Sequence, residues 1–193
     1  MKSSYLVLFA FIILINGCVK YKEYPFPYDN NNTIDKRLIG TWKINIEKTD
    51  FKNFFDGSKP KNDEDLIITF IPNKTNTIFD MSLSSPPIYK AYTSKLKKYN
   101  YLNFAVETNL NENNHYKYTI NDDELVLYML NPKILTEDIK NKKLWGDVSK
   151  NGVLPITDIY VFEEKESYKK YLLENDERLY NLPLYLTREK KVE

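Results

Sequence analysis

The fold of this chain is decided by residues 115–130, which read HYKYTINDDELVLYML. Two runs with strand character, the aromatic-rich 115–120 and the apolar 125–130, flank the polar tetrapeptide 121–124. Asparagine and aspartate favour tight turns because their short side chains hydrogen-bond to the nearby backbone and tolerate left-handed φ angles. The stretch therefore predicts a β-hairpin.

Other segments with strand character surround the hairpin. Apolar Trp42, Ile44 and Ile46 alternate with polar residues, which is typical of a strand with one buried face. The predicted strands outside the hairpin occupy 42–46, 66–71, 78–83, 88–96, 101–107, 156–162 and 184–188. Strands that follow one another with few helices between them favour an antiparallel meander, whereas a doubly wound sheet needs a helix after each strand.

Two helices are expected, and both follow the hairpin. The first occupies 131–145, where Asn131 suits the N-cap and Pro132 suits the first helical position. The second occupies 163–175, where apolar residues recur at helical spacing. We therefore expect a mainly β fold, an antiparallel up-and-down β-barrel with one inserted helix and one C-terminal helix.

The N-terminus has the pattern of a secretory signal. Lys2 supplies positive charge, and residues 5–15 form an apolar run that is shorter than the ~20 residues of a membrane-spanning helix. Gly17 is a small residue that suits cleavage after it, and Cys18 is the only cysteine. With Ile15 at its aliphatic position, this stretch resembles the lipobox of bacterial lipoproteins. An ordinary secretory signal with an incidental cysteine is the alternative.

The lipobox resemblance implies a division of the chain and a location. Residues 1–17 would be a signal peptide, 18–33 a lipid anchor and flexible tether, and 34–193 the barrel domain. Cys18 would carry a diglyceride and an acyl chain such as palmitate, which join the protein to a membrane. Val19 stands where aspartate would retain an enterobacterial lipoprotein, so the resemblance implies the bacterial cell envelope and its outer membrane.

A second resemblance concerns the barrel. Gly40 and Trp42 open the first predicted strand, and they resemble the G-x-W signature of lipocalins and related calycin barrels. In that family the tryptophan plugs the closed end of the barrel and an arginine from the last strand packs across its ring; Arg188 is the matching residue here. The pattern over 37–188 also resembles small lipocalin-like bacterial lipoproteins of uncharacterised function. The helix at 131–145 departs from lipocalins proper, so ligand binding does not follow from the resemblance.

Aromatic side chains on the predicted strands are the candidate lining of a pocket for a small apolar ligand. They are Tyr89, Tyr92, Tyr101, Phe104, Tyr116, Tyr118 and Tyr128. Side chains alone can also fill an eight-stranded barrel, so a filled core is the alternative.

Composition argues against several classes of function. The net charge is +1 and the lysines are interleaved with acidic residues, which disfavours nucleic-acid binding. The single histidine, His115, has no serine motif or metal-ligand spacing around it, and five glycines leave no phosphate loop. We expect no catalytic residue, metal or cofactor. The expected function is a non-enzymatic envelope lipoprotein that binds a small hydrophobic ligand; the alternative is a module with a filled core that binds or scaffolds an envelope protein.

Overall fold

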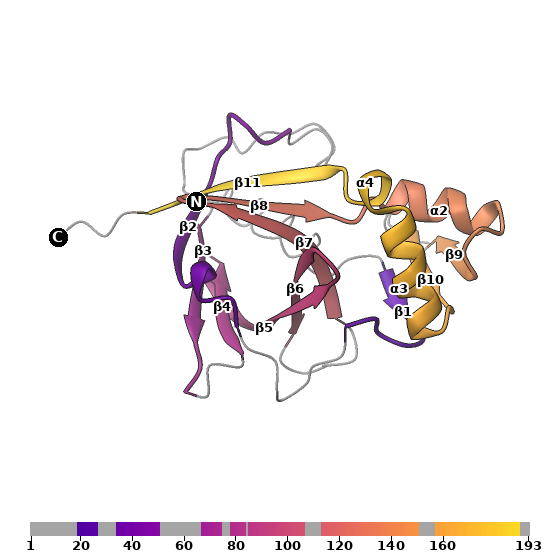
Figure 1. Cartoon of the computed structure of the whole chain (residues 1–193), viewed down its shortest axis with the longest axis horizontal. Coiled ribbons are helices and arrows are strands. Elements are labelled where there is room, and N and C mark those ends of the chain that lie inside the picture. Colours follow the sequence, from indigo (N-terminus) through magenta and orange to yellow (C-terminus); the bar gives the residue numbers. More distant parts are fainter. Residues whose placement is uncertain are drawn as a thin grey trace.

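The structure is a computed structural model that describes residues 19–26, 34–50, 67–74, 78–83, 85–106, 113–150 and 157–189. Within these residues, eight antiparallel strands form a closed barrel (Figure 1). The barrel strands are β2 (Gly40–Ile44), β3 (Ile67–Pro72), β4 (Phe79–Leu83), β5 (Ser85–Leu96), β6 (Tyr99–Val106), β7 (Asn113–Asn121), β8 (Glu124–Met129) and β11 (Leu182–Arg188). Strand β11 closes the barrel by pairing with both β8 and β2. The predicted antiparallel barrel is confirmed.

The predicted hairpin is the pair β7–β8. Its ladder ends at the pair Asn121 and Glu124, so Asp122 and Asp123 form the turn. Asp122 has a φ of 51°, a left-handed conformation that aspartate tolerates better than most residues. The predicted turn within residues 121–124 is therefore confirmed.

Side chains of the barrel strands serve two separate hydrophobic cores. On β6, Leu102 and Phe104 pack in the barrel core, together with Trp42 from β2. Tyr101, one residue away on the same strand, packs in a second core outside the barrel. This division follows from the alternation of side chains along a strand.

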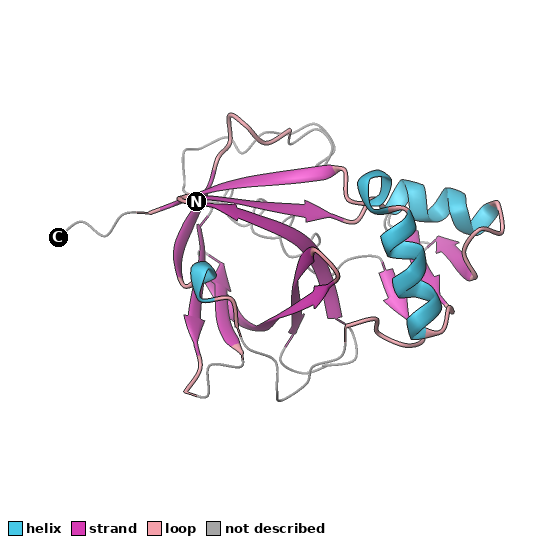
Figure 2. Cartoon of the chain, viewed as in Figure 1, coloured by secondary structure: helices cyan, strands magenta, loops and turns pink. Residues whose placement is uncertain are grey.

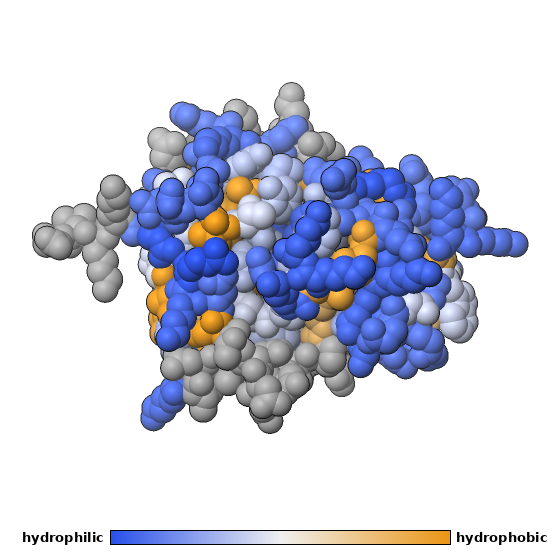
Figure 3. Space-filling model, in the orientation of Figure 1, coloured by the Kyte–Doolittle hydropathy of each residue, from blue (hydrophilic) through white to orange (hydrophobic). Residues whose placement is uncertain are grey.

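The second core lies between the barrel wall and an additional layer at one end of the molecule (Figure 2). The layer comprises β1 (Val19–Tyr21), α2 (Pro132–Lys140), β9 (Gly146–Lys150), β10 (Thr157–Val161), α3 (Lys165–Glu174) and α4 (Asp176–Leu179). Its three strands form a separate sheet in the order β1-β10-β9, with β1 parallel to β10. Except for β1, the layer is inserted between β8 and β11. Figure 3 shows a largely hydrophilic surface over α2 and α3.

The inserted helix has the predicted start and an earlier end. The Asn131 side chain accepts a hydrogen bond from the Lys133 amide at 3.0 Å, and Pro132 occupies the first turn. The helix ends at Lys140, and Lys142 adopts a left-handed φ of 58°. The predicted continuation to residue 145 is wrong because this turn leads the chain directly into β9. The predicted strand at 156–162 is β10, which belongs to the small sheet rather than to the barrel.

Residues 19–26 differ from the predicted flexible tether. Strand β1 joins the small sheet, and the Tyr24 hydroxyl donates to Asn103 Oδ1 at 2.9 Å. Phe26 is buried, and its ring stacks on that of Tyr101 with centroids 4.5 Å apart. The tether prediction is wrong for these residues, because burial of their aromatic rings on the barrel wall outweighs the loop-forming tendency of Pro25, which lies between Tyr24 and Phe26.

The remaining part of the predicted anchor and tether, together with the signal peptide, Gly17 and Cys18, lies outside the described residues. Within the part of the chain that the structure describes, no helix has the length and apolar character needed to cross a membrane.

Candidate functional site

One end of the barrel is covered by a short 3₁₀ helix, η1 (Lys36–Leu38), which comes just before β2. Leu38 is fully buried in the barrel core together with Ile34, so this segment reaches into the barrel. The indole Nε1 of Trp42 donates a hydrogen bond to the Leu38 carbonyl at 2.7 Å. The tryptophan and the 3₁₀ helix therefore hold each other in place at this end.

Arg188 lies across the same tryptophan. Its guanidinium carbon is 4.1 Å from the centroid of the Trp42 ring, so the contact predicted from the sequence is present. Its Nη1 donates to the Ile39 carbonyl at 2.8 Å, and its Nη2 donates to the Arg37 carbonyl at 2.5 Å. Gly40 has a φ of 121°, and a Cβ atom there would lie 3.2 Å from Nη1. Gly40, Trp42 and Arg188 therefore form one packing unit.

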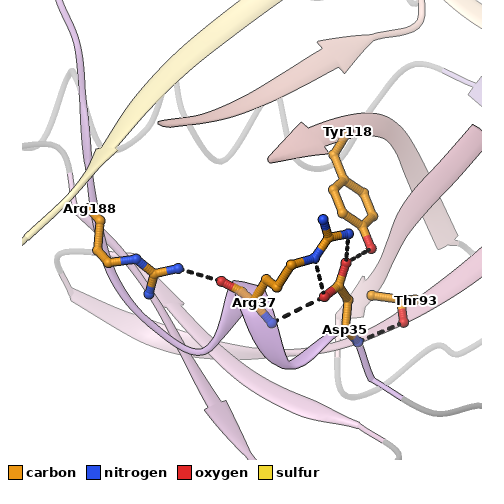
Figure 4. Close-up of polar contacts among 5 residues, drawn as sticks. All are labelled: Asp35, Arg37, Thr93, Tyr118 and Arg188. Carbon is orange, nitrogen blue, oxygen red and sulfur yellow. Dashed lines mark hydrogen bonds and ion pairs between the residues drawn. The ribbon is translucent and has the colours of Figure 1, made fainter. Parts of the chain in front are cut away.

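A polar group adjoins this unit (Figure 4). The Asp35 carboxylate accepts hydrogen bonds from Arg37, including one at 2.6 Å from Nη2, and one from the Tyr118 hydroxyl at 3.0 Å. The Asp35 amide donates to the Thr93 hydroxyl at 3.2 Å. Burial alone would raise the pKa of Asp35, but the hydrogen bonds from Arg37 and Tyr118 outweigh it and hold this pKa below its ordinary value. The group joins η1 to β5 and β7.

Four of the seven predicted lining residues do face the barrel interior: Tyr89, Phe104, Tyr116 and Tyr118. The rings of Phe104 and Tyr116 are stacked, with centroids 4.9 Å apart. The most exposed of the four, Tyr116, exposes only 7% of its surface, and the other described members of the barrel core are as buried or more so. All four rings are therefore almost completely shielded from solvent.

The other three predicted lining residues point outward, and the prediction is wrong for them. Tyr101 and Tyr128 pack in the second core, and the Tyr92 hydroxyl donates to the Phe26 carbonyl at 2.6 Å. The cause is strand alternation. Because Tyr89 and Ala91 face inward on β5, Tyr92 must face outward.

The second core contains the histidine, surrounded by aromatic rings. We call this group the His115 cluster; its rings, besides the imidazole, are those of Tyr21, Tyr24, Phe26, Tyr101 and Tyr180, with centroids 5.1 to 6.2 Å from the imidazole. The Tyr21 hydroxyl lies 3.5 Å from His115 Nδ1. Burial lowers the pKa of His115 to about 3, so the imidazole is neutral at physiological pH.

Several buried polar atoms around the His115 cluster lack a partner of normal hydrogen-bond geometry within the described residues. They are the hydroxyls of Tyr101, Tyr168 and Tyr180, His115 Nε2 and Asp176 Oδ1. The sequence analysis singled out His115 but did not predict this cluster. Adjacent residues of a strand point to opposite faces, so an inward-facing Tyr116 would have indicated that His115 lies on the outer wall of the barrel.

A buried ion pair lies next to the cluster. Lys117 on β7 pairs with Asp176 at the start of α4, and the two side chains are 12% and 3% exposed. The Lys117 ammonium also lies 5.0 to 5.4 Å from the ring centroids of Tyr99, Tyr128 and Tyr180. The pair joins the additional layer to the barrel wall, since each partner comes from one of them.

Neither region contains an arrangement that could hold a metal: the described residues include no group of three or more histidine, cysteine, aspartate or glutamate side chains placed for it. Comparisons with protein families, with curated protein sequences and with solved structures give no match to this chain.

Proposed function

We propose that this chain is a bacterial envelope lipoprotein, acylated at Cys18, whose folded part is a non-enzymatic module that binds or scaffolds another envelope protein. The lipobox resemblance at 14–18 supports the anchor. The meeting of Gly40, Trp42 and Arg188 at a covered barrel end supports the lipocalin-like character of the barrel.

The observation that carries the choice of a protein-binding module is the burial of the barrel interior. Tyr89, Phe104 and Tyr118 are each at most 4% exposed, although they are among the residues that would line a ligand pocket. A pocket for a drug-sized molecule leaves accessible surface on its lining when it is empty. The low exposure therefore favours a barrel filled by its own side chains over a ligand carrier.

Binding of a small apolar ligand is the second candidate. It is favoured by the four aromatic rings that face the interior, since such rings commonly line sites for apolar ligands. Tyr116 is the most exposed of the four rings, at 7%, and is therefore the position to enlarge in a test of ligand binding.

The anchor is tested by metabolic labelling with palmitate. Wild-type protein should incorporate label and fractionate with membranes, whereas Cys18→Ala should do neither. Equal labelling of both proteins would overturn the anchor.

The module is tested on protein extracted from its own membranes. Native mass spectrometry should give the mass of the acylated chain alone, and crosslinking in cells should give a defined adduct with another envelope protein. A stoichiometric co-purified lipid, lost in Tyr116→Trp, would instead establish the ligand carrier. Absence of any crosslinked partner would overturn the protein-binding module.

A further inference from the structure

The small sheet has one face that the second core does not cover. Ile159 and Val161 of β10 are buried in the second core. Tyr160 lies between them and therefore points to the opposite face, where the ammonium of Lys20 lies 5.3 Å from its ring centroid. This opposite face is called the outer face of the sheet below.

An exposed tryptophan lies at the end of the outer face. Trp145 is 59% exposed, although tryptophan is mostly buried in folded proteins. Its carbonyl accepts the Phe162 amide at 2.9 Å, which extends the β9–β10 ladder by one pair, and the two rings are 5.9 Å apart. Lys22, which follows β1, places its ammonium 5.7 Å from the indole centroid. The outer face thus combines three aromatic side chains with two lysines. The register also places Asp147, which pairs with Tyr160, and Asp158 on this face.

The outer face lies close to the proposed site of acylation, Cys18, in the sequence. Strand β1 begins at Val19, the residue that follows Cys18 in the sequence. With a strand rise of about 3.3 Å per residue, Lys22 lies within about 10 Å of Val19 along the chain. Acyl chains on Cys18 would therefore bring a bilayer surface close to Trp145.

We propose that the outer face of the small sheet rests on the bilayer that holds the acyl chains of Cys18, with the Trp145 ring in the headgroup region. This inference rests on the proposed acylation of Cys18. Tryptophan favours that region because its ring is apolar while its N–H can still hydrogen-bond to water or headgroups. Charge does not favour the contact, since Asp147 and Asp158 lie on the same face and Glu164 pairs with Lys22 at 3.0 Å. The proposal therefore rests on the exposed indole and its nearness to residue 19.

The chain offers a matched pair of fluorophores for the test. Its two tryptophans are Trp145, which is exposed, and Trp42, which is fully buried in the barrel core. The full-length acylated protein is reconstituted into phosphatidylcholine vesicles that carry a doxyl quencher near the headgroup. We expect part of the emission to be quenched by the doxyl lipid and protected from aqueous iodide. In Trp145→Phe the quenched part should disappear while Trp42 emission remains, which also shows that the barrel is folded.

A second variant controls for surface position. Ile71 on β3 is another large apolar side chain that is exposed, at 55%, but it belongs to the barrel rather than to the small sheet. In the Trp145→Phe background, Ile71→Trp should be quenched by iodide and not by the doxyl lipid.

Vesicle flotation separates the two levels of the proposal. Wild-type protein that floats, together with Cys18→Ala that does not, supports the anchor. Flotation combined with iodide quenching and no lipid quenching of Trp145 overturns the membrane contact and leaves the anchor standing. A wild-type protein without acyl chains that fails to float overturns both.

Discussion

Replacing Arg188 by Met should destabilise the barrel more than substitutions of partly exposed residues usually do. Methionine keeps an unbranched apolar stem but removes the guanidinium, which makes two hydrogen bonds to the carbonyls of Ile39 and Arg37 and lies 4.1 Å from the centroid of the Trp42 ring. Hydrogen bonds to charged groups contribute about 1.5–3 kcal/mol each and a cation–π contact about 0.5–2 kcal/mol. Because the Arg188 side chain is 26% exposed and the contacts are not additive, we expect a loss of roughly 2–4 kcal/mol.

The loss is measured by urea unfolding of the full-length protein in detergent, followed by tryptophan fluorescence. Lys48→Met is the matched control, since Lys48 makes an exposed ion pair with Glu124; its effect should stay below about 0.5 kcal/mol. A double-mutant cycle with Trp42→Phe isolates the coupling between guanidinium and indole. If Arg188→Met lowers the unfolding free energy by no more than Lys48→Met does, Arg188 does not stabilise this end of the barrel.

Three further changes test the second core. Phe26→Ala should lower the unfolding free energy by about 3–5 kcal/mol, because a buried ring is removed, whereas an unchanged urea midpoint would restore the tether interpretation. His115 has a pKa of about 3 when folded, below its unfolded value of about 6.5, so the unfolded state binds the proton first; stability should be full above pH 6.5 and fall by up to about 1.4 kcal/mol per pH unit as pH drops toward 3. His115→Phe should flatten this slope in urea titrations between pH 6.5 and 4.5, and an identical slope in both proteins would contradict the burial of a neutral imidazole. Lys117→Met leaves the Asp176 carboxylate buried without its cation and should cost about 3–5 kcal/mol by thermal unfolding, while Lys117→Met combined with Asp176→Asn should recover part of the loss; no recovery would argue against the ion pair.

The barrel could be predicted from the sequence because its signals are local. Period-two alternation around Trp42 reports a strand with one buried face, and the residues at 121–124 specify a turn by their own side-chain chemistry. The contact of Arg188 with Trp42 is not local, and it was predicted only through a resemblance to barrels that share the pattern.

The second core could not be predicted in the same way. Strand β1 is held by parallel pairing with β10, which is distant in the sequence, and β9 reads GDVSK, a composition with little strand propensity. Tyr92, Tyr101 and Tyr128 were assigned to the interior because aromatic strands suggest a lining. Alternation along the strands from Tyr89 and Leu102 places Tyr92 and Tyr101 outside the barrel. Because a second core packs on the outer wall, however, both faces of β6 are hydrophobic, and the sequence does not show which face points inward.

The pairing of β1 with β10 also sets an order of events during biogenesis. Val19 has its partner in Ile159, so this part of the sheet cannot form until most of the chain has been synthesised. Until then residues 19–21 have no partner strand to pair with. An enzyme that acts on Cys18, as the proposed acylation requires, would thus act next to a segment whose partner strand is among the later parts of the chain to be made.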